Sequence, residues 1–302
     1  MVKVKLIAYS KPTAEGVTKH LPVLAFKVSI GKLHDHSLEY YLSDKYPEEK
    51  VKRILLSAVE FPSILEHITF TFIVEDISRV CSHQLVRHRL ASFTQESQRY
   101  SESYMKRVVE RIVKAYLDKK LKLQQDDSSS LRHNYLKTGI EELKKMYEHK
   151  RYSDIIEVFL NQSSPKYSSG ESIRACYDMR DDYNKVLLEA VNEAFVLPGS
   201  IRDEDKICLA EDLLRAVQRY YELISSGVKY EDARFVVPQA VKTRLMVTVN
   251  LRELLHIACL RLSPKAQWEI RKVVELMIEE VVKIVPEVKE LVKLYCKAYG
   301  VR

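Results

Sequence analysis

Glycine is scarce in this sequence. Seven glycines among 302 residues are about 2% of the chain, against roughly 7% in average proteins. No two of them are spaced as in G-x-G-x-x-G or in a Walker-type phosphate loop, so both glycine-based nucleotide-binding devices are excluded. Any phosphate-bearing ligand must therefore be held by side chains or by the N-terminus of a helix.

Long apolar runs and cysteine motifs are also missing. No run of 18 apolar residues occurs, and the first ten residues alternate as a strand does, so we expect neither a membrane span nor a signal peptide. The five cysteines are odd in number, widely spaced and form no C-x-x-C pair. We therefore expect reduced thiols, packed in the core of a cytoplasmic protein. The net charge of +7 is a mild excess that favours anionic partners.

The hydrophobic periodicity predicts an α+β fold with few strands and many packed helices. Strands are expected at residues 2–8, 67–74 and 240–249, with residues 24–30 as a candidate partner of the first. Helices are expected at residues 47–60, 76–86, 105–123, 136–152, 154–160, 183–195, 203–223, 250–262, 266–285 and 287–298, the second of them capped by Asp76. We interpret residues 1–302 as a single domain with a mainly helical expansion at about 105–200.

A polar segment follows the helix predicted at 76–86. It carries Arg87, Arg89 and Arg99 among hydroxyl and amide side chains, with Glu96 as its one acid. In an extended segment Arg87 and Arg89 point the same way, because side chains repeat every two residues. Guanidiniums beside hydroxyls suit a doubly charged phosphate, although a solvated basic loop explains the same composition.

A second polar set lies on the helix that Asn250 opens. Arg261 comes eleven residues after Asn250, which is about three turns, so the two share a face, while Arg252 and His256 lie roughly on the other side. Apolar residues surround Arg261 in the sequence, so its guanidinium requires an anionic or carbonyl partner. An internal salt bridge and a bound ligand both satisfy that requirement.

These residues carry a resemblance. Arg87-His88-Arg89, followed after seven residues by Ser97, resembles the R-H-R-x7-S motif of the flavin-dependent thymidylate synthases. Further blocks fall in that family's order. Residues 66–72 resemble E-H-x-x-F-T-F, and Gln84 precedes the motif by three positions. Residues 97–101, 234–238, 243–244 and 248–250, Arg261 and residues 266–270 follow. The matched parts cover roughly residues 1–104 and 225–285.

The resemblance implies methylation of dUMP to dTMP, with methylenetetrahydrofolate as carbon donor, NADPH as reductant and bound FAD. It also implies a homotetramer with shared active sites and small-molecule partners, without nucleic acid, membrane or metal. Carried over by position, the FAD-binding residues would be His67, Thr69, Arg87, His88, Arg89, Asn250, Arg252 and His256. The dUMP-binding residues would be Gln84, Arg87, Gln95, Glu96, Ser97, Gln98, Arg99, Arg234 and Arg261. Arg261 would be the catalytic residue, since a cation beside the pyrimidine stabilises the negative charge that develops there.

Three positions depart from the family pattern. Many members carry an acid at the position of Gln95 and asparagine at that of His256, and histidine is frequent at the position of Lys265, near the folate side. A flavin-binding paralogue without dUMP methylation is therefore one alternative. A basic nucleic-acid-binding protein is another, but it leaves Arg261 unexplained. A cysteine nucleophile is not supported, because no cysteine stands at a motif position.

Overall fold

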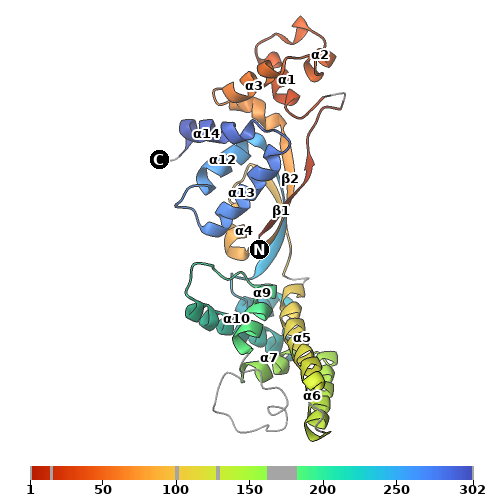
Figure 1. Ribbon diagram of the computed structural model, residues 1–302. Coiled ribbons are helices and arrows are strands. Elements are labelled where there is room, and N and C mark those ends of the chain that lie inside the picture. The colour runs from red at the N-terminus through yellow and green to blue at the C-terminus, as the bar shows by residue number, and fades with distance from the viewer. Residues whose placement is uncertain (1, 14–15, 99–101, 127–129, 162–181, 301–302) are drawn as a thin grey trace. The chain divides into compact units, whose positions relative to one another are not determined.

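The computed structural model describes residues 2–13, 16–98, 102–126, 130–161 and 182–300 (Figure 1). The chain forms two compact units: the first is Met1–Glu96 with Thr243–Arg302, and the second is Ser97–Lys242. The second unit thus includes more residues than the helical expansion predicted at about 105–200. The assignment of the whole chain to one domain stays a prediction.

The first unit contains a four-stranded sheet in the order β1-β2-β4-β3. Its strands are β1 Lys3–Tyr9, β2 Thr69–Ser78, β3 Ala91–Gln95 and β4 Lys242–Asn250. β1 pairs antiparallel with β2, and β3 pairs antiparallel with β4. Along β2, Phe70, Phe72 and Val74 are buried on one face while threonines alternate on the other. The three predicted strands are confirmed, and the α+β class with them.

Helices pack on the buried face of this sheet (Figure 1). The helices of the first unit are α1 His20–Ser29, α2 Leu38–Leu42, α3 Glu48–Ser57, α4 Arg79–Leu85, α12 Leu251–Arg261, α13 Trp268–Val282 and α14 Val288–Tyr299, with 3-10 turns at Leu33–Asp35 and Pro62–His67. The buried aromatic residues of β2 share one core with Leu254 of α12 and Val274 of α13. This core fixes α12, which carries most of the second predicted polar set.

The second unit is helical and has a core of its own. Its helices are α5 Ser103–Asp126, α6 Ser130–Glu148, α7 Tyr152–Leu160, α9 Tyr183–Ala194, α10 Asp203–Ser225 and α11 Tyr230–Ala233, followed by a 3-10 turn at Arg234–Val236. Phe159 and Tyr183 stack in that core with ring centroids 4.9 Å apart. Among the described residues, no helix has the length and apolarity needed to cross a bilayer.

Two local predictions are wrong. Residues 24–29 belong to helix α1, with Ile30 as its C-cap, and not to a strand. A short apolar run fits either structure, and here α1 packs against α3 and the turn at Pro62–His67. Asp76 does not cap α4, because β2 continues to Ser78, whose hydroxyl accepts a hydrogen bond from the Cys81 backbone N–H at 3.0 Å. Asp76 has a left-handed φ of 59° and pairs with Lys3 instead.

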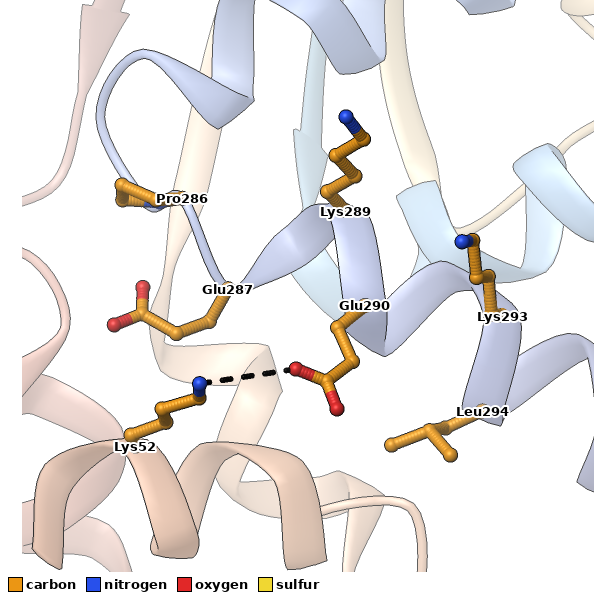
Figure 2. Close-up of a pocket in the computed structure, with 7 residues that line it drawn as sticks. All are labelled: Lys52, Pro286, Glu287, Lys289, Glu290, Lys293 and Leu294. Carbon is orange, nitrogen blue, oxygen red and sulfur yellow. Dashed lines mark ion pairs between the residues drawn. The ribbon is translucent and has the colours of Figure 1, made fainter. Parts of the chain in front are cut away.

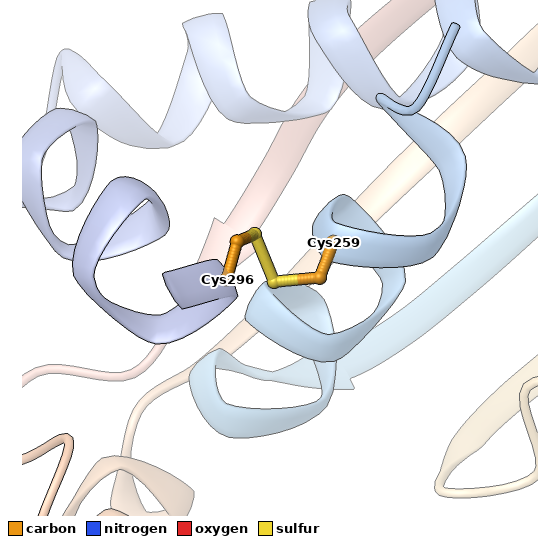
Figure 3. Close-up of a disulfide and its surroundings, with 2 residues drawn as sticks. All are labelled: Cys259 and Cys296. Atoms are coloured by element: carbon orange, nitrogen blue, oxygen red, sulfur yellow. A yellow bond between two sulfur atoms is a disulfide. The ribbon is translucent and has the colours of Figure 1, made fainter. Parts of the chain in front are cut away.

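The expectation of five reduced, buried cysteines is also wrong. Cys259 on α12 and Cys296 on α14 form a disulfide (Figure 3). Cys208 is exposed, Cys81 is buried as expected, and Cys176 lies outside the described residues. The two bonded cysteines are 37 residues apart, so only the packing of the two helices brings them together. Sequence spacing does not reveal such a pair.

Candidate active site

Helix α4 leads into the R-H-R segment, and its start is fixed by a buried carboxylate. Glu269, at the start of α13, accepts hydrogen bonds at 2.6 Å from both the backbone N–H and the hydroxyl of Ser78. Beyond α4, Arg87 and Arg89 are exposed while His88 between them is buried. The segment consists of turns instead of the predicted extended chain, but the two arginines do face solvent together.

Arg261 ends α12 and contacts this segment. Its Nε donates to Nε2 of His88 at 3.1 Å, and one terminal nitrogen donates to the Gln84 carbonyl at 3.4 Å. No described carboxylate lies within ion-pairing distance of Arg261, so the internal salt bridge considered from the sequence does not form within the described chain. Among the residues that the structure describes, both hydrogen-bond partners of the Arg261 guanidinium are thus neutral acceptors.

The second nitrogen of His88 faces a buried acid. His88 Nδ1 lies 3.7 Å from a carboxylate oxygen of Glu253, and both side chains are almost fully buried. Burial, with Arg261 and His256 adding to it, lowers the pKa of His88 to about 4. Burial also raises the pKa of Glu253, against the opposing effects of His256 and Arg252. His88 is therefore neutral near pH 7 and can accept the hydrogen bond from Arg261.

The other end of α12 gathers part of the predicted cofactor set. Asn250 caps the helix, accepting from the Glu253 backbone N–H at 2.8 Å. The Leu251 backbone N–H donates to the Ile68 carbonyl at 2.8 Å, which brings residues 67–69 beside residues 250–252. His67, Thr69, Asn250 and Arg252 thus lie on two neighbouring segments. Arg252 forms an ion pair with Glu66, and both side chains are 44% exposed.

The β3 end of the site is held by internal hydrogen bonds. The Gln95 amide donates to the hydroxyls of Ser82 at 2.8 Å and Thr243 at 3.2 Å. The Glu96 carbonyl accepts from Arg79 at 2.7 Å. One carboxylate oxygen of Glu96 is buried without a hydrogen-bond partner in the described part of the chain. A buried acceptor without a donor is costly, so Glu96 is suited to a ligand N–H or O–H.

The remaining predicted residues are His256, which lies near His88, and residues that belong to the second unit. Ser97 and Gln98 are half-buried at the boundary of the second unit, and Arg99 lies outside the described residues. Arg234 belongs to the second unit, where its Nε donates to the Glu231 carbonyl at 2.9 Å. His256 is exposed, with its ring centroid 6.4 Å from that of His88.

Sequence reasoning missed Glu253 and Glu269. Glu253 follows the predicted cap by three residues, and leucines at 251, 254 and 255 surround it. An acid in that apolar setting was a signal of a buried partner. Glu269 had no such signal, because its partner Ser78 is 191 residues away in sequence.

A hollow of about 650 Å³ lies elsewhere in the first unit, between α3 and α14 (Figure 2). Lysines and glutamates line most of it; its lining is Lys52, Pro286, Glu287, Lys289, Glu290, Lys293 and Leu294. Glu290 pairs with Lys52 at 4.0 Å. The hollow contains none of the predicted site residues, so we do not assign it to the active site.

The fold and these side chains define a class of protein: an α+β protein whose arginines and hydroxyls, near the edge of a small sheet, suit an anionic ligand. A family model described as thymidylate synthase complementing protein matches residues 6–287. The flavin-dependent thymidylate synthase of Pyrococcus furiosus is 33% identical over 285 residues, which are 94% of this chain and 80% of that protein. The enzyme of the same name from Pyrococcus horikoshii is 33% identical over 288 residues, with the same shares of each chain.

Solved structures agree at the level of the fold. Thymidylate synthase X from Helicobacter pylori, determined with FAD and dUMP, has a TM-score of 0.56 at 17% identity, covering 98% of this chain and 99% of that one. The family match covers nearly the whole chain, and the relatives are similar over most of their length. The chain belongs to the flavin-dependent thymidylate synthase family.

Proposed function

We propose that the protein catalyses the reductive methylation of dUMP to dTMP, with methylenetetrahydrofolate as carbon donor, NADPH as reductant and FAD as cofactor. The observation that supports this best is the Arg261 guanidinium, which is held by two neutral acceptors and keeps its charge. Such a cation suits a pyrimidine on which negative charge develops.

The residues near the start of α12 fit a flavin dinucleotide in the chemistry of their donors. His67, Thr69 and Arg252 offer an imidazole, a hydroxyl and a guanidinium on adjoining segments, and none of them is fully buried. We assign FAD binding to these residues with Asn250, Arg87, Arg89 and His256. His88 belongs to the same predicted set, but its ring is turned inward, so a contact with FAD would come from its backbone. FAD, when bound, supplies the hydride chemistry.

We assign dUMP to the other end of α12. Arg261 would stabilise charge at the pyrimidine carbonyls, and Gln84 would lie beside it, because the Gln84 carbonyl already contacts that arginine. The unpartnered oxygen of Glu96 would accept from dUMP. Arg87, Gln95, Ser97, Gln98, Arg99 and Arg234 complete the proposed substrate set, with Arg99 and Ser97 as donors to the phosphate. Phosphate binding by arginines agrees with the absence of glycine-rich phosphate loops from the sequence.

The cysteines take no part in this proposal. Burial raises the pKa of the Cys81 thiol, and Glu269 raises it further while Arg261 opposes. An activated nucleophile requires the opposite shift. We therefore assign no nucleophilic cysteine to the reaction. In the proposed mechanism Arg261 acts electrostatically, and the other proposed site residues bind and orient the substrate and FAD.

We also propose a homotetramer with shared active sites and a cytoplasmic location. The proposed substrates are charged metabolites that do not cross membranes unaided, which supports a site inside the cell. Size-exclusion chromatography with light scattering tests the assembly.

The flavin spectrum of the purified protein, recorded with and without dUMP, tests cofactor and substrate together. We expect bound FAD whose absorbance changes when dUMP is added. Tritium release from [5-³H]dUMP with methylenetetrahydrofolate and NADPH then tests the reaction. FAD binding without tritium release would indicate the paralogue that has lost methylation, and failure to bind FAD would overturn the proposal.

A further inference from the structure

His88 connects the two ends of α12. One ring nitrogen accepts from Arg261, the last residue of the helix, and the other faces Glu253 in its first turn. Arg261 and Glu253 are eight residues apart, which is about two turns, so they cannot contact each other directly. The imidazole bridges this interval from the turn after α4.

The bridge works in one protonation state. Nε2 must carry a lone pair to accept from Arg261, so the single proton of the neutral ring lies on Nδ1, facing the Glu253 carboxylate. A doubly protonated ring would point an N–H at the Arg261 N–H. A buried carboxylate behind a histidine is a recurring device for fixing its tautomer and orientation.

The groups around the bridge all favour the neutral ring or its orientation. On α12 these are Arg261 and His256, both of which disfavour a second proton on His88, and Glu253 on the opposite side of the ring. Cys81 of α4 lies near enough to Arg261 to be influenced by it, as well as by Glu269 of α13. The Gln84 carbonyl fixes a second donor of the guanidinium. Two nitrogens of the Arg261 guanidinium thus donate hydrogen bonds to neutral acceptors, which fixes its orientation.

We infer that His88 and Glu253 are positioning residues that aim the Arg261 guanidinium at the substrate. Neither needs to touch dUMP or FAD through its side chain. The role rests on the proposed function for what Arg261 then does, but the positioning itself is a property of the chain. Glu253 fixes His88, and His88 fixes Arg261.

The first test reads Arg261 without using activity. Phenylglyoxal labels free guanidiniums, and peptide mass spectrometry gives the labelling rate of Arg261 relative to the exposed Arg53 of α3 in the same molecule. We expect His88→Leu to speed Arg261 labelling at least fivefold, and Glu253→Leu about threefold. His88→Gln should stay within twofold of the wild type, because its amide oxygen can accept from Arg261.

Matched controls are the exposed His83 on α4 and the exposed Glu279 on α13. His83→Leu and Glu279→Gln should leave the labelling ratio unchanged. Equal ratios in His88→Leu and in the wild type would overturn the inference. An equal increase of the Arg261 labelling ratio in His88→Leu and in the control variants would overturn it as well, since that would indicate a general loosening of the fold.

The second test is a double-mutant cycle on turnover. We expect His88→Leu to lower kcat at least thirtyfold with FAD content retained, and to have less than a twofold effect in an Arg261→Ala background. Additive losses would overturn the inference. If the wild type itself released no tritium from dUMP, the proposed function would fail, whereas the labelling ratio would still decide whether His88 positions Arg261.

Discussion

The two ends of α12 hold their arginines in opposite ways. Arg252, at the start of the helix, pairs with the carboxylate of Glu66, and the pair is about half exposed. Arg261, at the end, contacts an imidazole and a backbone carbonyl and has no described carboxylate partner. An arginine paired with an acid has its charge largely compensated, whereas one held by neutral acceptors presents that charge to a ligand. The difference predicts binding at one end and catalysis at the other.

The largest effect should come from removing the uncompensated arginine. Arg261→Ala is expected to lower kcat/KM for dUMP by about a thousandfold, the size of effect seen when one preorganised donor to a developing charge is lost. FAD content should not change. Arg252→Ala should instead weaken FAD binding about tenfold, the scale of one charge-assisted hydrogen bond. Tritium release and flavin absorbance measure the two.

This comparison of the two ends of α12 would be wrong if Arg261→Ala and Arg252→Ala both lost turnover alone, or both lost FAD binding. Arg261→Lys is the matched control, because it keeps the charge but not the planar fork; it should recover part of the rate. Normal turnover in Arg261→Ala would remove Arg261 from the catalytic assignment.

Sequence reasoning found both arginines but not what distinguishes them. The Asn250 cap, β2 and the amphipathic helices follow from local patterns of two and 3.6 residues, and the structure has them. Whether His88 points inward depends on the turn after α4, and α4 begins where Glu269 of a distant helix binds Ser78. The partners of Arg261 and the disulfide are likewise products of tertiary packing, which no local pattern encodes.

A smaller effect is expected from the covalent link near the Arg261 end. Cys259 and Cys296 are 37 residues apart, and closing a loop of that length stabilises a folded chain by about 4 kcal/mol in the chain-entropy model. The double variant Cys259→Ser/Cys296→Ser should lower Tm by about 10 °C in calorimetry. Turnover at 25 °C should fall less than tenfold, because His88 and Gln84 still hold Arg261.

Substitution of the exposed Cys208 provides the control. Cys208→Ser should leave Tm unchanged, and a reductant should shift the wild type toward the double variant without affecting that variant. If Tm did not respond to either treatment, the disulfide would make no contribution to stability.

The smallest effect is the pH dependence of the free energy of unfolding. It too should differ between the two ends of α12. The pKa of His88 falls from 6.5 to about 4 on folding, chiefly through burial. The unfolded chain therefore binds the proton first, and stability is lost as pH falls from 6.5 toward 4, by about 2 kcal/mol at pH 5. The raised pKa of Glu253 acts in the opposite sense, because the folded state then takes up that proton more readily.

Urea unfolding of the FAD-free protein at pH 7 and pH 5 isolates the histidine when wild type and His88→Gln are compared, because Glu253 and every other group is common to both. The wild type should lose about 2 kcal/mol more than the variant between the two pH values. Glu66→Gln, at the other end of α12, removes only an exposed ion pair and should cost less than about 1 kcal/mol at either pH. Equal pH dependence in wild type and His88→Gln would mean that His88 is not held neutral in the fold. In that case Nε2 could not act as the acceptor on which the Arg261 end of the helix depends.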